Sequence, residues 1–185
     1  MFFYIVFLVF LLWALLEFRH AGMRALGQPG AKIDDRRTLP ILFAVIISSI
    51  FLGFAAWLIL PQEFPRGAAA IGANLMLIGM ALREWSVFTL GKFFTVDVAV
   101  QAEHRVITSG PYRYIRHPAY SGVLLTMLGA GLIFGNWFGL ALAFLPGSAL
   151  LLWRIRVEEE VLERELDEPY RAYMLKTKRL IPFLY

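Results

Sequence analysis

Residues 40–60 constrain this chain most, because they form an apolar run that contains no charged residue. The run is about as long as the roughly 20 residues that a helix needs to cross the hydrocarbon core of a bilayer. A backbone in lipid must satisfy its own hydrogen bonds, so such a run predicts a transmembrane helix. The composition agrees, since 59% of the 185 residues are hydrophobic and 17% are charged, against about a quarter charged in soluble domains. We therefore expect an integral membrane protein.

Four more apolar runs predict further spans, at residues 1–16, 67–82, 118–134 and 138–153. No basic residue precedes the first run and no A-x-A-like site follows it, so we expect a span and not a cleaved signal peptide. The third span should continue as a helix through Leu90 and the fifth through Glu163. Span three is rich in glycine and alanine, which allow close helix approach in lipid. Residues 17–39 and 91–117 are expected to be polar loops.

Lysines and arginines predict the orientation. Five lie in residues 17–39, five in 83–117 and seven in 154–185, whereas the turns at 61–66 and 135–137 together contain one, Arg66. Loops on the cytoplasmic side carry the excess of positive charge. We therefore expect five spans in a cell membrane, with the N-terminus outside and the C-terminus in the cytoplasm.

Several kinds of chemistry are excluded by residue type. The chain has no cysteine and only three histidines, so thiol nucleophiles, disulfides and cysteine-ligated zinc are ruled out and no metal site is expected. No G-x-G-x-x-G follows a strand, which argues against a Rossmann domain. The net charge of +4 fits cytoplasmic loops, and we expect no nucleic-acid partner.

Residues 110–122, GPYRYIRHPAYSG, form the most polar and aromatic stretch between two apolar blocks. Pro118 suits the first turn of a helix, and the residue before a proline is biased away from helix. His117 and Tyr120 should therefore lie at a helix N-terminus, where free N–H groups favour an anionic ligand. The alternative interpretation is a basic and aromatic belt where the chain enters the membrane.

Arg154 and Glu158 are four residues apart, so they share one face of a helix. Arg154 falls at the membrane boundary, where a charge reaches for the headgroups, pairs with another residue or serves a cavity. The alternative to a functional role is an arginine that extends to the headgroups with Glu158 as its partner. The acidic run at 158–165 is otherwise expected to be mostly a solvated helical face.

Together these residues resemble a known family. The pattern H-x-V-I-x-x-G-x-Y-x-x-x-R-H-P-x-Y-x-G starts at His104, R-x-x-x-E-E-x-x-L starts at Arg154 after an apolar hairpin, and Y-x-x-Y and R-x-x-P start at Tyr170 and Arg179. Over residues 93–185 this is similar to the isoprenylcysteine carboxyl methyltransferase family, and the phospholipid N-methyltransferases share much of it. The chain resembles a short prokaryotic member, without the extra helices of the eukaryotic prenylcysteine enzymes. It departs from the family pattern at residues 166–167, where Leu-Asp replaces the usual Phe-Gly.

The resemblance implies a membrane methyltransferase that uses S-adenosylmethionine without a Rossmann sheet. The implied cofactor contacts are His104, Arg105, Val106, Ile107, Tyr112, His117, Pro118, Ala119, Tyr120 and Glu158, with a further loop contact near Asp97. Arg154 is the implied substrate-orienting residue and our catalytic candidate. Glu158 suits the ammonium or ribose of the cofactor, and N–H groups at a helix start suit its carboxylate.

We therefore expect an all-α fold with five transmembrane helices and a cytoplasmic cofactor pocket, formed by the 91–117 loop and the helical extension after span five. Residues 1–90 should form a three-span membrane region and residues 91–185 the methyltransferase core. Carboxyl O-methylation of a lipophilic or lipidated substrate is favoured, because an ionised carboxylate needs orientation but no general base. The alternatives are N-methylation of a phospholipid amine and a non-catalytic membrane scaffold or small transporter.

Overall fold

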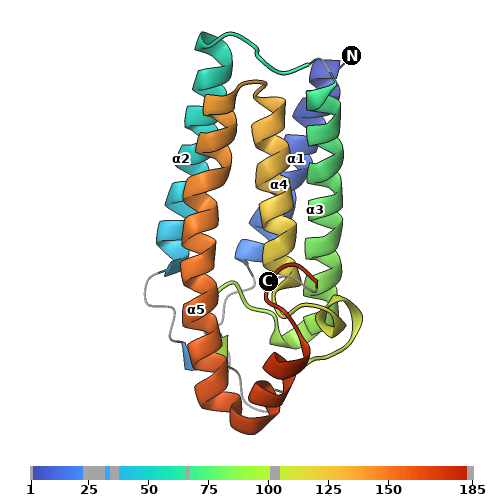
Figure 1. Ribbon diagram of the computed structural model, residues 1–185, viewed down its shortest axis with the longest axis vertical. Coiled ribbons are helices and arrows are strands. Elements are labelled where there is room, and N and C mark those ends of the chain that lie inside the picture. Colours follow the sequence, from blue (N-terminus) through green and yellow to red (C-terminus); the bar gives the residue numbers. More distant parts are fainter. Residues whose placement is uncertain (1, 23–31, 34–37, 66, 101–104, 183–185) are drawn as a thin grey trace.

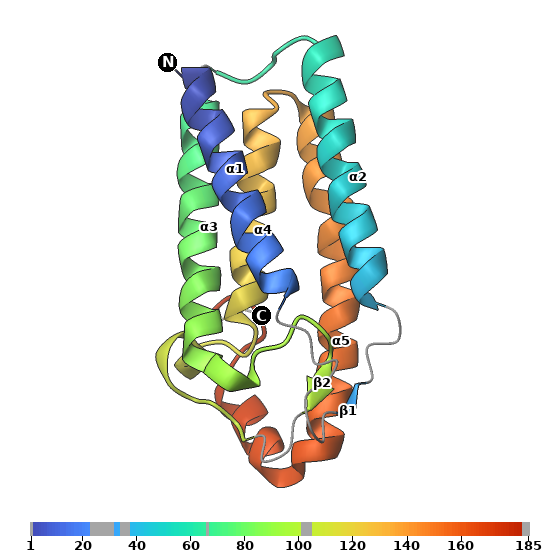
Figure 2. The ribbon, with the colours of Figure 1, turned by 180° about the vertical axis from the view of Figure 1, so that it is seen from behind.

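The computed structural model describes residues 2–22, 32–33, 38–65, 67–100 and 105–182. Long helices dominate this part of the chain and run side by side as a bundle (Figures 1 and 2). They are α1 (Phe2–Ala21), α2 (Thr38–Ile59), α3 (Ala68–Leu90), α4 (Pro118–Ile133) and α5 (Trp137–Lys176). The mostly helical fold that the apolar runs predict is thus confirmed.

Shorter elements gather at one end of the bundle (Figure 2). They are the 3-10 helices η1 (Gly91–Phe93) and η2 (Gly110–Arg113) and the two-residue strands β1 (Lys32–Ile33) and β2 (Ala99–Val100). The strands pair antiparallel, with Lys32 opposite Val100 and Ile33 opposite Ala99. The expected polar loop at 91–117 is therefore partly ordered into short elements.

The outer surface of the bundle is apolar. Within the described residues, α2 and α5 are long and apolar enough to cross a membrane by length and composition, and α4 is a shorter apolar helix. Large apolar side chains such as Phe7, Leu8 and Phe51 face outward and are exposed. An exposed apolar surface of this extent is unfavourable in water and expected in lipid.

Glycines bring α3 and α4 into close contact. Gly72 and Gly79 are two helical turns apart on α3, as are Gly122 and Gly129 on α4. A Cβ atom on Gly79 would lie 2.5 Å from the carbonyl oxygen of Gly122, and one on Gly72 would lie 2.5 Å from that of Gly129. The glycines therefore let the two backbones touch, which confirms the close approach expected from the small residues of span three.

The prediction that a polar loop begins at residue 17 is wrong, because α1 continues to Ala21. The charged residues of this last turn pair with α3. Arg83 contacts both carboxylate oxygens of Glu17, at 2.8 and 2.9 Å. The Nε2 atom of the buried His20 lies 2.9 Å from a carboxylate oxygen of Glu84. Because each charge meets a partner on the neighbouring helix, the helix can extend past the apolar run.

Helix α5 runs well beyond the bundle, as expected, and then turns back (Figure 1). The turn occurs at Asp167, whose backbone has φ +45° and ψ −129°. This conformation is nearly exclusive to glycine, and residue 167 is where the family pattern usually has one. The backbone therefore keeps the turn that the family pattern implies, although the residue is aspartate.

The segment after α5 returns to the start of α4. The backbone N–H groups of Arg116 and His117 donate to the carbonyl oxygens of Lys178 and Arg179, at 2.8 and 2.9 Å. The Ser121 hydroxyl donates to the carbonyl oxygen of Leu180 at 2.6 Å. These bonds attach the segment to residues 115–121, directly beside the start of α4.

Candidate functional site

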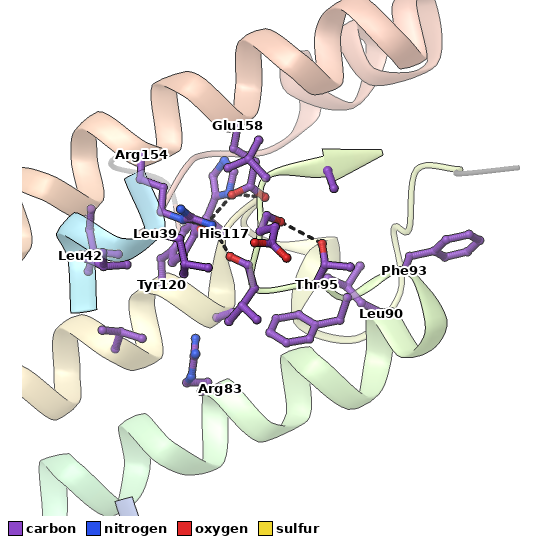
Figure 3. Close-up of a pocket in the computed structure, with 18 of the residues that line it drawn as sticks. Leu39, Leu42, Arg83, Leu90, Phe93, Thr95, His117, Tyr120, Arg154 and Glu158 are labelled. Carbon is purple, nitrogen blue, oxygen red and sulfur yellow. Dashed lines mark hydrogen bonds and ion pairs between the residues drawn. The ribbon is translucent and has the colours of Figure 1, made fainter. Parts of the chain in front are cut away.

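A cavity of about 420 Å³ lies where the helical bundle meets the loops and the α5 extension (Figure 3). One part of its wall is apolar and comes from α1 and α2, including Trp13, Leu42 and Phe43. Another part is polar and comes from the 94–100 segment, α4 and α5, including Asp97 and Glu158. The volume is within the range of small-molecule sites.

Arg154, Tyr120 and Glu158 form a hydrogen-bonded chain in the cavity wall (Figure 3). The Arg154 Nε–H donates to the Tyr120 hydroxyl oxygen at 3.0 Å, and that hydroxyl donates to Glu158 Oε2 at 2.6 Å. Arg154 and Glu158 share a face of α5 because they are one helical turn apart. Tyr120, in the first turn of α4, connects the two charges.

The Arg154 guanidinium also joins elements that are distant in sequence. Its Nη1 donates to the Thr38 hydroxyl at the start of α2, and its Nη2 donates to the carbonyl oxygen of Val96. Only 2% of Arg154 is exposed. A buried guanidinium must have its N–H groups paired, and these contacts hold its charge in a fixed position at the cavity wall.

Beside this chain lies a buried ion cluster centred on Glu159. Arg116 Nε donates to Glu159 Oε1 and Arg179 Nε donates to Oε2, both at 2.8 Å, and His117 Nε2 lies 3.3 Å from Oε1. Burial alone would raise the pKa of Glu159, but the hydrogen bonds from His117 and Arg116 outweigh it and lower the pKa to about 2. The carboxylate is therefore ionised at neutral pH.

His117 lies between two carboxylates. Its Nδ1 is 3.9 Å from Glu158 Oε1, on the side opposite Glu159, and its ring stacks on Tyr120 with centroids 5.6 Å apart. The start of α4 thus faces two carboxylates, of which Glu159 is already paired with Arg116 and Arg179. Glu158 is the one of the two that lines the cavity, and its carboxylate favours a cationic ligand group there, in contrast to the anionic group expected from a helix N-terminus alone.

Nearly all the residues predicted from the family pattern meet at this cavity. Its lining includes Arg105, Val106, Ile107, Tyr112, His117, Ala119, Tyr120, Arg154 and Glu158, together with Asp97. Pro118 is different, since it is buried in the first turn of α4 and is not part of the lining. His104 lies outside the described residues.

Some residues of the site were not predicted. The expectation of a mostly solvated acidic face is wrong for Glu159, which is buried. Tyr170, Arg83 and Glu17 also line the cavity without having been proposed for it. For Arg83 and Glu17 a signal existed, because opposite charges directly follow the apolar parts of two helices.

Comparisons with known proteins agree with this arrangement. The Isoprenylcysteine carboxyl methyltransferase (ICMT) family matches residues 71–164. A rice protein (Oryza sativa subsp. indica) named "Probable protein-S-isoprenylcysteine O-methyltransferase" is 32% identical over 121 residues, which cover 62% of this chain and 61% of the rice protein. Protein-S-isoprenylcysteine O-methyltransferase B of Arabidopsis thaliana is 30% identical over 120 residues, covering 61% of this chain and 58% of the relative.

The fold is also similar to a solved structure, that of a eukaryotic intramembrane Ras methyltransferase named ICMT. The TM-score is 0.66 at 25% sequence identity, and the match covers 78% of this chain and 53% of that one. This chain therefore spans about three fifths of the plant relatives and about half of the solved protein. Because the family match covers half of the chain and includes α4, Arg154 and Glu158, this protein belongs to the isoprenylcysteine carboxyl methyltransferase family.

Proposed function

We propose that this protein transfers a methyl group from S-adenosylmethionine to the carboxylate of a lipophilic substrate of the isoprenylcysteine type. The observation that carries the proposal is that one cavity is bordered both by apolar side chains of the bundle and by buried or half-buried charges of α5 and the 94–100 segment. A charged, water-soluble methyl donor needs the polar wall, and a lipophilic acceptor needs the apolar one. The names of the relatives support methyl transfer.

The residues of the polar wall fit the donor. Asp97 and Glu158 place negative charge where a sulfonium and an ammonium would be bound. The rings of Tyr112 and Tyr120 offer faces that attract cations. Arg105 is exposed at the cavity and can meet the carboxylate of the donor. When bound, the cofactor would supply a methyl group on a positively charged sulfur, which an ionised carboxylate can accept without a general base.

Arg154 is our candidate for orienting the acceptor. It is held rigidly by Tyr120, Thr38 and Val96, so its positive charge is preorganised beside the apolar wall. A buried cation attracts a carboxylate that has lost its water, and fixed geometry lowers the entropic part of the barrier. Tyr120 is hydrogen-bonded to both Arg154 and Glu158, so it holds the residue proposed for the methyl acceptor and the residue proposed for the methyl donor in a fixed relative position.

We also propose that all five long helices cross the membrane, with the cavity at the cytoplasmic side. The loops and the α5 extension that border the cavity lie at one end of the bundle, and they carry nearly all the lysines and arginines. A reporter fused after Tyr185 should be active only in the cytoplasm. Activity only outside the cytoplasm would contradict this topology.

The decisive experiment incubates membranes containing the protein with methyl-labelled S-adenosylmethionine and treats the lipid-soluble product with base. A carboxyl methyl ester loses the label, whereas a methylated amine keeps it. Base-stable label would overturn carboxyl O-methylation in favour of an amine acceptor. No transfer to prenylated cysteine compounds or to membrane lipids, from a protein shown to be folded, would overturn the enzymatic proposal.

The same assay tests Arg154. Arg154→Lys should lose most of its turnover, because an ammonium cannot reproduce the planar contacts of the guanidinium, while the affinity for the donor stays within about twofold of wild type. Arg156→Lys, at an exposed position on the same helix, is the matched control and should be fully active. Wild-type turnover in Arg154→Lys, with an unchanged melting temperature, would contradict the orienting role.

A further inference from the structure

The hydroxyl group of Tyr170 is buried at the cavity but forms no hydrogen bond with the described residues. The residue is 4% exposed, and it lines the cavity from the short helical stretch after the turn at Asp167. Its hydroxyl oxygen is buried and has no hydrogen-bond partner among the described residues. A buried polar group without a partner costs free energy, so phenylalanine would be the better residue here for folding alone.

Tyr173 shows what a purely structural tyrosine looks like in the same place. It is 7% exposed, also lines the cavity, and its ring centre is 6.0 Å from that of Tyr170. Its hydroxyl, however, donates to the backbone carbonyl oxygen of Tyr112 at 2.6 Å. Two neighbouring tyrosines thus differ in one respect, since the hydroxyl of Tyr173 is used by the fold and that of Tyr170 is not.

We infer that the Tyr170 hydroxyl binds the methyl donor, by donating a hydrogen bond to a neutral acceptor on its adenosine part. The inference rests on the proposed function, because it requires that the donor occupies this cavity. Tyr170 begins the Y-x-x-Y element of the family pattern but is not among the cofactor contacts that the resemblance implies, so the inference adds a binding residue in the α5 extension.

The hydroxyl is suited to act as a hydrogen-bond donor. Burial raises the pKa of Tyr170, and the negative charges of Glu159 and Glu158 raise it further. Tyr170 therefore remains protonated throughout the physiological range. It can give a hydrogen bond to an acceptor in the cavity without any change in its own charge.

The surroundings favour a neutral acceptor over an anionic one. The carboxylates of Glu158 and Glu159 act electrostatically on Tyr170, and the nearby Arg116 is already paired with Glu159. The lining that α5 contributes to the cavity also includes the aliphatic Val161 and Leu166, which belong to one apolar cluster. An apolar surface next to a single hydrogen-bond donor suits a purine ring or a ribose, whereas a carboxylate would meet the like charge of Glu158.

The test compares Tyr170→Phe with Tyr173→Phe in protein purified in detergent, measured by titration calorimetry and thermal unfolding. The probes are S-adenosylhomocysteine and 5′-methylthioadenosine, which lacks the amino-acid part. Tyr170→Phe should weaken the binding of both probes by about three- to tenfold, the effect of one lost hydrogen bond, with an unchanged or higher melting temperature. Tyr173→Phe should lower the melting temperature by about 2–4 °C, because it leaves a buried carbonyl without its donor.

Each other outcome is decisive. If wild-type protein binds S-adenosylhomocysteine and Tyr170→Phe binds both probes equally well, the inference fails and the proposed function stands. If Tyr170→Phe weakens S-adenosylhomocysteine but not 5′-methylthioadenosine, the acceptor is on the amino-acid part and the adenosine assignment is overturned. If folded wild-type protein binds neither probe, the proposed function fails and the inference with it.

Discussion

Replacement of Glu159 by glutamine should destabilise this protein more than any change at its exposed acidic positions. The Glu159 carboxylate accepts hydrogen bonds from Arg116 and Arg179, both at 2.8 Å, and faces His117 at 3.3 Å. A glutamine offers one oxygen where the carboxylate has two, and its NH₂ group would point at an N–H donor. Arg116, whose side chain is 8% exposed, would be left buried without a counter-ion.

Loss of the Glu159 carboxylate should lower the free energy of unfolding by about 3 kcal/mol. Breaking a buried ion pair by removing one partner costs about 3–5 kcal/mol. Independently, the pKa of Glu159 falls from its ordinary 4.5 to about 2, which corresponds to about 3 kcal/mol of stability. Because the folded-state pKa is the lower one, this stability is present above pH 4.5 and is lost as the pH falls from about 4.5 towards 2.

The assay is thermal unfolding in detergent, followed by tryptophan fluorescence, for wild type, Glu159→Gln and Glu163→Gln. About 3 kcal/mol should lower the melting temperature of a chain of this size by about 6–12 °C at pH 7. Glu163 pairs with Arg171 at 3.0 Å, but both side chains are more than 40% exposed, so Glu163→Gln should cost at most about 1 kcal/mol.

The pH dependence gives a second readout. Between pH 4.5 and the acid limit of the detergent preparation, wild-type stability should fall more steeply than that of Glu159→Gln, which has already lost the ionised group. A melting temperature for Glu159→Gln no lower than that of Glu163→Gln would refute the reasoning. Parallel acid profiles for wild type and Glu159→Gln would refute it as well.

Three further predictions concern the site, the turn and the helix packing. Glu158→Gln should weaken S-adenosylhomocysteine binding at least about tenfold by calorimetry with little change in melting temperature, and unchanged affinity would remove Glu158 from the donor site. Asp167→Gly should raise the unfolding temperature, because relief of the strain at positive φ stabilises the fold by about 1 kcal/mol or more. The exposed ion pair with Arg171 that is lost contributes less than this. A lower unfolding temperature would show that the ion pair matters more than the backbone strain. Gly129→Ala should destabilise by about 1–3 kcal/mol, since its Cβ would overlap the Gly72 carbonyl oxygen, and wild-type stability would mean that α3 and α4 can separate freely.

Local signals in the sequence determined the helices. The uncharged run at 40–60 predicted a transmembrane helix, and the apolar helix α2 is observed at Thr38–Ile59. Pro118 predicted the start of α4 because its ring suits a first helical turn and restricts the preceding residue, and α4 begins there. The spacing of Arg154 and Glu158 predicted a shared face for the same reason, since helical periodicity is a local property.

Family resemblance located the cavity residues, but their contacts depended on the fold. Nothing in the spacing of Arg154 predicts that its guanidinium meets Thr38 and Val96. These partners come from other elements, and only the packing of α2 and the 94–98 segment against α5 brings them near. Likewise, the helix end at Glu17 and His20 reads as a loop until α3 supplies Arg83 and Glu84.

Three consecutive glutamates on α5 separate most clearly what the sequence determines from what the tertiary structure determines. Glu158 borders the cavity, Glu159 is buried and Glu160 is exposed, although the three are consecutive in the sequence. Composition and periodicity establish that a charged helical segment follows the membrane span. Whether a given carboxylate is buried depends on cations from other parts of the chain, here Arg116 and Arg179. The cost of removing a charge from water is recovered only where such partners converge, and that convergence is a property of the tertiary structure alone.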